Sequence, residues 1–214
     1  MSRLLMVVAS LLLLILFISP LWQITLIAPQ YPDGVALKIW IDKIGGDQPG
    51  TLQNINILNH YVGMKPIEPE SIPELGYLKY IVIAMTGLGL LAAWINLKPG
   101  FLIWTVLLVS LGVLGMYDFY LWEYDYGHNL DPNAPIKIEG QAYQPPLFGQ
   151  KTLLNFLAKS YPHIGGMAMF VSMLLGSLSF WIKNKTKDYE KDQLSPRVAR
   201  VAPVDRVLSE ATAD

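Results

Sequence analysis

The stretch Phe101–Trp122, FLIWTVLLVSLGVLGMYDFYLW, decides the fold class of this chain. Asp118 is its only charged residue, and a bilayer core is crossed by about 20 predominantly apolar residues in a helix. Similar runs lie before and after it, and four transmembrane spans are therefore predicted. The other three are Leu4–Trp22, Tyr77–Leu97 and about His163–Ile182. We expect the first run to be an uncleaved span, because no small-residue cleavage site precedes Ala28.

The composition agrees with a membrane protein. Of 214 residues, 52% are hydrophobic and only 15% are charged, whereas soluble domains carry about 25% charged residues. The absence of cysteine excludes disulfides, thiolate zinc sites, iron–sulfur clusters ligated by cysteine, and haem attached through CxxCH. The net charge of -1 and the lack of a basic patch indicate no nucleic-acid partner. No phosphate-binding loop, GxGxxG or HExxH occurs, so we expect no enzymatic activity.

The charges predict the orientation. Arg3, Lys98 and the basic cluster after Ile182 would share one side, which the positive-inside rule makes cytoplasmic. Both termini would then be cytoplasmic, and two acid-rich segments would lie outside. The predicted fold is mostly α, an integral membrane four-helix bundle whose two outer segments form a small mixed α/β cap. Its parts are spans at 1–22, 77–97, 101–122 and 162–182, outer segments at 23–76 and 123–161, a turn at 98–100 and a tail at 183–214.

Local patterns predict the elements of the outer segments. Ala36–Asp42 alternates and indicates a half-buried strand. Thr51 is expected to cap a short helix that Gly63 ends, because helices commonly stop at a glycine in the left-handed region. In the second segment we expect a strand-like IKIEG at 136–140, an amphipathic helix at Thr152–Leu157 and a last span capped by Ser160.

Three further expectations concern the spans and the tail. Lys98-Pro99-Gly100 is expected to form a tight turn, and the polar stretch Lys183–Asp214 a largely disordered tail. The glycines of the last span, Gly165, Gly166 and Gly176, would allow close packing. The aromatic residues that crowd the end of the third span are typical of an aromatic belt at a membrane interface.

His60 and Met64 are the first candidate metal ligands. They lie in LQNINILNHYVGMKP, Leu52–Pro66, four positions apart. A thioether is a soft ligand, so a His–Met pair suits copper, particularly Cu(I). The alternative is that His60 caps helix carbonyls and Met64 fills a gap in the core.

His163 and Met167 are also four residues apart, at the outer end of the last span, and would share a helix face. Asp118 lies within the third span, and His128 falls on roughly the same helix face if that helix continues. These four complete the predicted metal-ligand set of His60, Met64, His163, Met167, His128 and Asp118. The alternatives are an interfacial histidine and a carboxylate that reaches water.

Long strings of this sequence carry a family resemblance: APQYPDGVALKIWI (28–41), LQNINILNHYVGMKPIEPESIPEL (52–75), YDFYLWEYDYGHNLDPNAPIKI (117–138) and YPHIGG (161–166). They resemble a group of bacterial four-span membrane proteins associated with nitrous oxide reductase gene clusters. The resemblance implies the inner membrane of a bacterium and a role in assembly, copper supply or electron supply for a periplasmic copper enzyme.

The residues and the resemblance together predict an inner-membrane accessory protein, with copper as its candidate cofactor. Its partners would be the lipid bilayer and a periplasmic or membrane protein. Two alternatives stay open at this point. One is a quinol-binding anchor subunit, with Asp118, His163 and the aromatic end of the third span as its pocket. The other is a purely structural scaffold.

Overall fold

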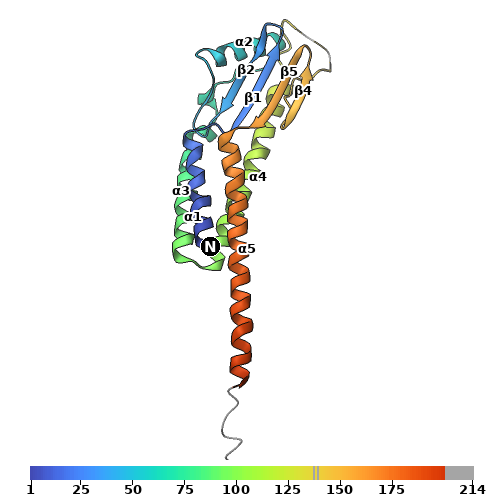
Figure 1. Ribbon diagram of the computed structural model, residues 1–214. Helices are drawn as coiled ribbons and strands as arrows, with labels where there is room; N and C mark the ends of the chain where they lie inside the picture. The colour runs from blue at the N-terminus through green and yellow to red at the C-terminus, as the bar shows by residue number, and fades with distance from the viewer. Residues whose placement is uncertain (137, 139, 201–214) are drawn as a thin grey trace, which may run out of the picture.

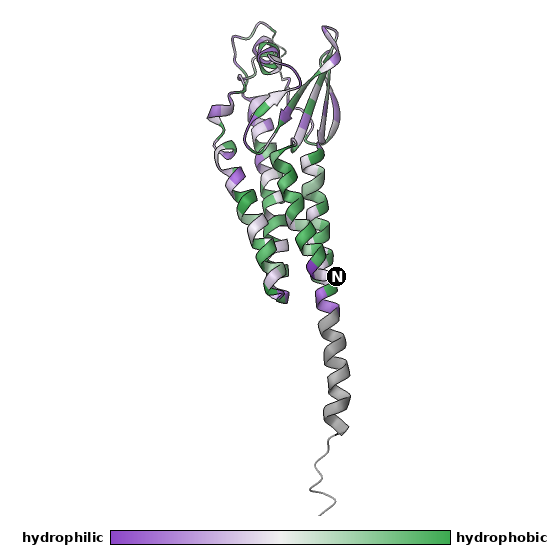
Figure 2. Ribbon diagram, turned by 60° about the vertical axis from the view of Figure 1, so that its left-hand side comes forward, coloured by the Kyte–Doolittle hydropathy of each residue, from purple (hydrophilic) through white to green (hydrophobic). Residues whose placement is uncertain are grey.

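The computed structural model describes residues 1–136, 138 and 140–200. The chain is mostly helical, with three long apolar helices and a small antiparallel sheet. The helices form a bundle, the sheet covers one end of it, and one helix projects beyond the other end (Figure 1). Apolar residues dominate the bundle, while polar residues are frequent at the sheet end (Figure 2).

Four helical segments form the bundle. The three that are long and apolar enough to cross a membrane are α3 (Glu74–Ile95), α4 (Lys98–His128) and α5 (Ile164–Arg200, apolar as far as Lys185). Helix α1 (Ser2–Leu12) continues as the 3-10 helix η1 (Leu13–Phe17), and together they make a shorter apolar helix. Helix α1 packs against α3 and α5. It buries Met6 and Ala9, and η1 buries Leu13 and Leu16 on the continuation of the same helix. A four-span bundle is therefore not established by helix length, because the first helix is short.

The first helix is shorter than the predicted span Leu4–Trp22. The chain leaves helical geometry after Phe17, and strand β1 begins at Trp22. Pro20 stands between them and cannot donate the backbone hydrogen bond that a continuing helix requires.

Glycines allow the helices of the bundle to approach closely. A Cβ atom on Gly89 of α3 would lie 2.1 Å from Ser10 Oγ of α1 and 2.7 Å from Trp104 Nε1 of α4. A Cβ atom on Gly176 of α5 would lie 2.6 Å from Cζ3 of the same tryptophan. The predicted close packing at Gly176 is confirmed, and the buried Trp104 is the residue that needs it.

The sheet unites the two polar segments. Its strands are β1 (Trp22–Ala28), β2 (Tyr31–Ile39), β3 (Ile44–Gly46), β4 (Gly149–Leu153) and β5 (Phe156–Pro162), in the antiparallel order β3-β2-β1-β5-β4. Strand β1 of the first segment pairs with β5 of the second from Trp22 to Ile27. We call the sheet, the helix α2 (Thr51–Val62), the short 3-10 helix η2 (Pro69–Ser71) and the last turns of α4 (119–128) the cap.

One apolar cluster fills the cap between the sheet and its helices. It contains Ile24, Val35 and Leu37 from the strands, Ile55 from α2 and Tyr126 from α4. The predicted strand Ala36–Asp42 is confirmed in part, because β2 contains its first four residues but ends at Ile39. The predicted stop of α2 is confirmed, since Gly63 has φ 81°. The predicted cap at Thr51 is wrong, because the N-cap of this helix is Gly50. Helix α4 reaches this cluster because its 31 residues span about 46 Å, more than a hydrocarbon core of about 30 Å.

Two expectations for the second segment are wrong. Thr152–Leu157 is part of the β4–β5 hairpin and not a helix. A short apolar run is ambiguous between helix and strand, and here the free edge of β1 decides in favour of a strand.

Ser160 does not cap a helix. It is buried in β5, accepts a hydrogen bond from Trp22 Nε1 and donates one to Leu147 O, and α5 begins only at Ile164.

Three other expectations are corrected or lie outside the described residues. The turn between α3 and α4 lies at Asn96 and Leu97, because Asn96 adopts the left-handed conformation and Pro99 is already in the first turn of α4. Residues 183–200 of the expected tail continue α5 and are not disordered, and residues 201–214 lie outside the described residues. The strand-like segment at 136–140 includes residues 137 and 139, which are outside the described residues.

Candidate functional site

The structure separates His60 from Met64. Gly63, in the left-handed conformation, ends α2 and donates to Asn59 O and His60 O, so Met64 does not continue the helix. His60 is exposed, and its ring lies tilted at 57° beside the ring of Tyr61, with ring centroids 6.3 Å apart. Met64 turns inward and packs against the apolar cluster of the cap. The i, i+4 proximity that the sequence suggests is therefore lost at the glycine.

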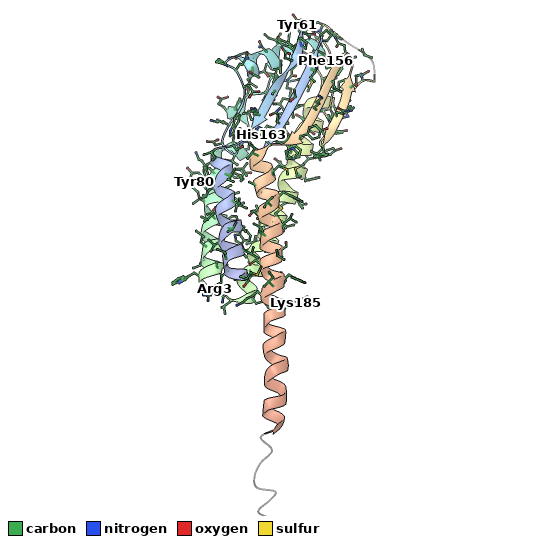
Figure 3. All side chains as sticks on the ribbon, viewed as in Figure 1. Arg3, Tyr61, Tyr80, Phe156, His163 and Lys185 are labelled. Carbon is green, nitrogen blue, oxygen red and sulfur yellow. The ribbon has the colours of Figure 1, made fainter. Side chains whose placement is uncertain are left out.

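His163 and Met167 lie where the cap meets the bundle. The His163 N–H donates to Leu21 O, its Nδ1 lies 3.3 Å from Ser19 Oγ, and the Met167 N–H donates to His163 O. The Met167 side chain is 51% exposed. Tyr61, beside His60, lies at the opposite end of the cap from His163 (Figure 3). The two predicted His–Met pairs therefore do not meet.

His128 and Asp118 occupy the outer face of α4. His128 is exposed at the end of the helix, donates from Nδ1 to Tyr124 O at 3.0 Å, and stacks on the ring of Tyr124. Asp118 is exposed. Among the residues that the structure describes, no group of three or more His, Asp or Glu side chains could hold a metal ion. The six predicted ligands thus do not assemble one metal site of that kind.

A cavity lies inside the cap. It has a volume of about 80 Å³ and lies between the sheet, α2 and the end of α4. Its walls are mainly aliphatic, including Ile24, Leu37, Ile55 and Leu153, and Met64 also faces it. The lining also contains five polar or amphipathic residues: Asn59, Trp122, Glu123, Tyr126 and Tyr143.

Glu123 is the unusual residue of this cavity. Its side chain has 0% exposure, and neither carboxylate oxygen has a hydrogen-bond partner among the described residues. Trp122 Nε1 and the Tyr143 hydroxyl are also buried without a partner. Buried polar groups in proteins are nearly always satisfied, so three unsatisfied groups around one cavity mark it as the candidate site.

The local sequence explains how Glu123 comes to be buried. Phe119, Trp122, Glu123 and Tyr126 occupy positions i, i+3, i+4 and i+7 of α4, which form one helix face. This face packs on the cap cluster, and it carries the carboxyl group inside together with its apolar neighbours. The acid within an apolar stripe is the signal in the sequence that could have identified the site.

Gly127 brings Tyr143 to the same place. The Tyr143 N–H donates to Gly127 O, and a Cβ atom on Gly127 would lie 2.4 Å from Gln144 Cα. Only glycine permits this approach without movement of the backbone, so the segment around Tyr143 closes over the end of α4. The Lys65–Asp125 ion pair, 2.8 Å long and half-exposed, ties the loop after α2 to the outside of the same helix.

Comparison of the chain with family models, with curated proteins and with solved structures found no match.

Proposed function

We propose that this chain is a bacterial inner-membrane accessory protein that crosses the membrane four times and has its cap on the periplasmic side. The distribution of charge supports this orientation. Arg3 and Lys185 lie at the end of the bundle away from the cap (Figure 3), and Lys98 begins α4 at that end. The positive-inside rule assigns such an end to the cytoplasm. Local thinning of the bilayer would accommodate the short first helix.

The proposed role is copper handling, maturation or electron supply for a periplasmic copper enzyme such as nitrous oxide reductase. The observation that carries it is the placement of the three histidines: His60, His128 and His163 all lie in the cap or at its junction with the bundle. Met64 lies there as well. Copper would be cargo of this face, held in passing by the His and Met side chains and delivered to a docked partner. The resemblance of the sequence to proteins of nitrous oxide reductase clusters supports the same role.

Copper binding tests the role directly. The full chain, purified in detergent, is titrated with Cu(I) against a chromophoric competitor, alongside His60→Ala and His163→Ala. We expect stoichiometric binding by the wild type and weaker binding by at least one variant. A wild type that leaves all Cu(I) with a competitor of micromolar affinity is incompatible with copper handling.

Labelling tests the orientation independently. Because the chain has no cysteine, Ser71→Cys in the cap and Lys98→Cys at the far end each provide one thiol. In spheroplasts of an expressing bacterium, a membrane-impermeant maleimide should label Ser71→Cys at once and Lys98→Cys only after lysis. The reverse pattern would place the cap in the cytoplasm.

A further inference from the structure

The cavity of the cap contains one buried carboxyl group with no neighbour to neutralise it. The ion pairs among the described residues are Lys38–Asp47 and Lys65–Asp125, and neither involves Glu123. Burial of a charge without a partner is strongly unfavourable, and a protein resolves it by protonation or by binding an opposite charge. The contents of the cavity therefore decide the state of Glu123.

The size of the cavity limits what it can contain. By the same measure of volume, one water molecule needs about 10–15 Å³, and a cavity that binds benzene measures about 150 Å³. The 80 Å³ of this cavity accommodates an ion with a few water molecules.

Two other side chains that line the cavity, besides Glu123, can coordinate a cation. The side-chain nitrogen of Asn59 donates to Lys65 O at 3.4 Å, which leaves its amide oxygen as an acceptor, and Met64 contributes a thioether. Water molecules around the ion would accept a hydrogen bond from Trp122 Nε1 and bond to the Tyr143 hydroxyl. The Glu123 carboxylate, the Trp122 indole N–H and the Tyr143 hydroxyl would then all have partners.

We propose that this cavity binds a single monovalent cation, with the Glu123 carboxylate as its charge partner and Asn59 and Met64 as neutral ligands. One carboxylate balances one positive charge, whereas a divalent ion would leave a net charge buried in an apolar site. Both Cu(I) and an alkali ion fit this charge. They differ at Met64, because a soft thioether binds Cu(I) and contributes little to Na⁺ or K⁺. Binding of Cu(I) in this cavity rests on the proposed role in copper handling, whereas binding of an alkali ion does not depend on that role.

The experiment uses the full chain in detergent, as wild type, Glu123→Gln and Met64→Leu, with Glu70→Gln and Met116→Leu as matched controls. Cu(I) affinity is measured by competition, and the thermal midpoint is compared in sodium, potassium and choline chloride. For Cu(I) we expect an ion in the cavity besides any ion held by the histidines, with an affinity at least tenfold weaker in both cavity variants but unchanged in the controls. For an alkali ion we expect a midpoint raised over choline, an effect that Glu123→Gln abolishes and Met64→Leu leaves intact.

The outcomes separate this site from the proposed function. If the wild type binds no Cu(I) and melts identically in all three salts, the cavity holds a neutral acid and water, and the proposal is overturned. Cu(I) binding that His60→Ala or His163→Ala weakens and Glu123→Gln does not would also overturn it, while supporting copper handling. An alkali effect that depends on Glu123, without Cu(I) binding, supports the cavity site and removes the copper role.

Discussion

The interiors of the bundle and of the cap differ in how fully their buried polar groups are satisfied, although Ser160 and Asn59 of the cap have hydrogen-bond partners. In the bundle, buried hydroxyl and indole groups each donate to a backbone carbonyl: Ser10 to Met6, Thr86 to Val82, Trp104 to Met85, Thr105 to Phe101, Ser172 to Ala9 and Ser179 to Ser2. In the cap, the carboxylate of Glu123, the indole N–H of Trp122 and the hydroxyl of Tyr143 have no partner among the described residues.

The contrast indicates different purposes for the two regions. The buried polar groups of the bundle are mostly small and neutral, and they form hydrogen bonds with backbone carbonyls, as an apolar membrane interior requires. Its two amide oxygens without a partner, those of Asn96 and Asn184, lie at the end away from the cap. The cap places an ionisable group in its core at a cost in stability. Proteins retain such costs where activity requires them, so the cap is the region in which we expect function.

The largest effect is expected in the bundle, at Trp104. This side chain is 2% exposed, packs on Gly89 and Gly176, and donates to Met85 O. Trp104→Ala should lower the free energy of unfolding by about 3–5 kcal/mol, as is typical of large buried aromatics. Trp94→Ala is the matched control, because Trp94 is 80% exposed on α3. Denaturation in detergent measures both, and equal effects would contradict the packing described for the bundle.

Replacement of Glu123 should raise the free energy of unfolding, whereas replacement of Trp104 should lower it. Glu123→Met replaces an unsatisfied buried group by an apolar one of similar shape, and should raise the free energy of unfolding by about 1–3 kcal/mol in metal-free choline buffer. Glu70→Met, on the exposed surface of the cap, should change it by less than about 0.5 kcal/mol. Chemical denaturation of the two variants beside the wild type provides the measurement. A loss of stability in Glu123→Met would mean that the carboxyl group has a structural partner.

A hydrogen bond in the bundle should have a smaller effect. Ser172 Oγ donates to Ala9 O at 2.6 Å and links α5 to α1. Ser172→Ala should cost about 0.5–1.5 kcal/mol. Ser177→Ala removes an exposed bond to Met173 O within the same helix and should be nearly silent. The difference in thermal midpoint between the two variants reports the link between helices, and it should vanish if α1 does not dock on α5.

The sequence predicted those elements that depend on neighbours close in the chain. The stop at Gly63 and the strand around Leu37 follow from local geometry and alternation. The hairpin at 149–162 does not, because its strand partner β1 lies far away in the sequence and becomes adjacent only after folding. The turn at Asn96 was missed because Pro99 and Gly100 suggest a turn just as strongly.

The candidate site was predicted in part, and the reason lies in α4. An aromatic belt accounts for Tyr117, Tyr120 and Tyr124, which are exposed. Trp122 and Tyr126 belong instead to the interior of the cap, and Glu123 lies between them. The exposed tyrosine face and the buried face of α4 differ only in their direction around the helix axis. They can be told apart only when it is known that the helix continues into the cap. Met64 was predicted as a metal ligand from its chemistry, but its orientation depends on the left-handed turn at Gly63.

The smallest effect is expected at the surface of the cap, where Lys65 and Asp125 form an ion pair with both side chains about half-exposed. Solvent screens such pairs, so the coupling energy from a double-mutant cycle of Lys65→Ala and Asp125→Ala should be only about 0.2–1 kcal/mol. It should decrease further in 1 M salt, where the Debye length falls to about 3 Å. A coupling of several kcal/mol that persists at high salt would show that this charge pair is desolvated. Asp125 is two residues from Glu123, and the contrast between a solvated and an unsolvated carboxylate on one helix would then no longer hold.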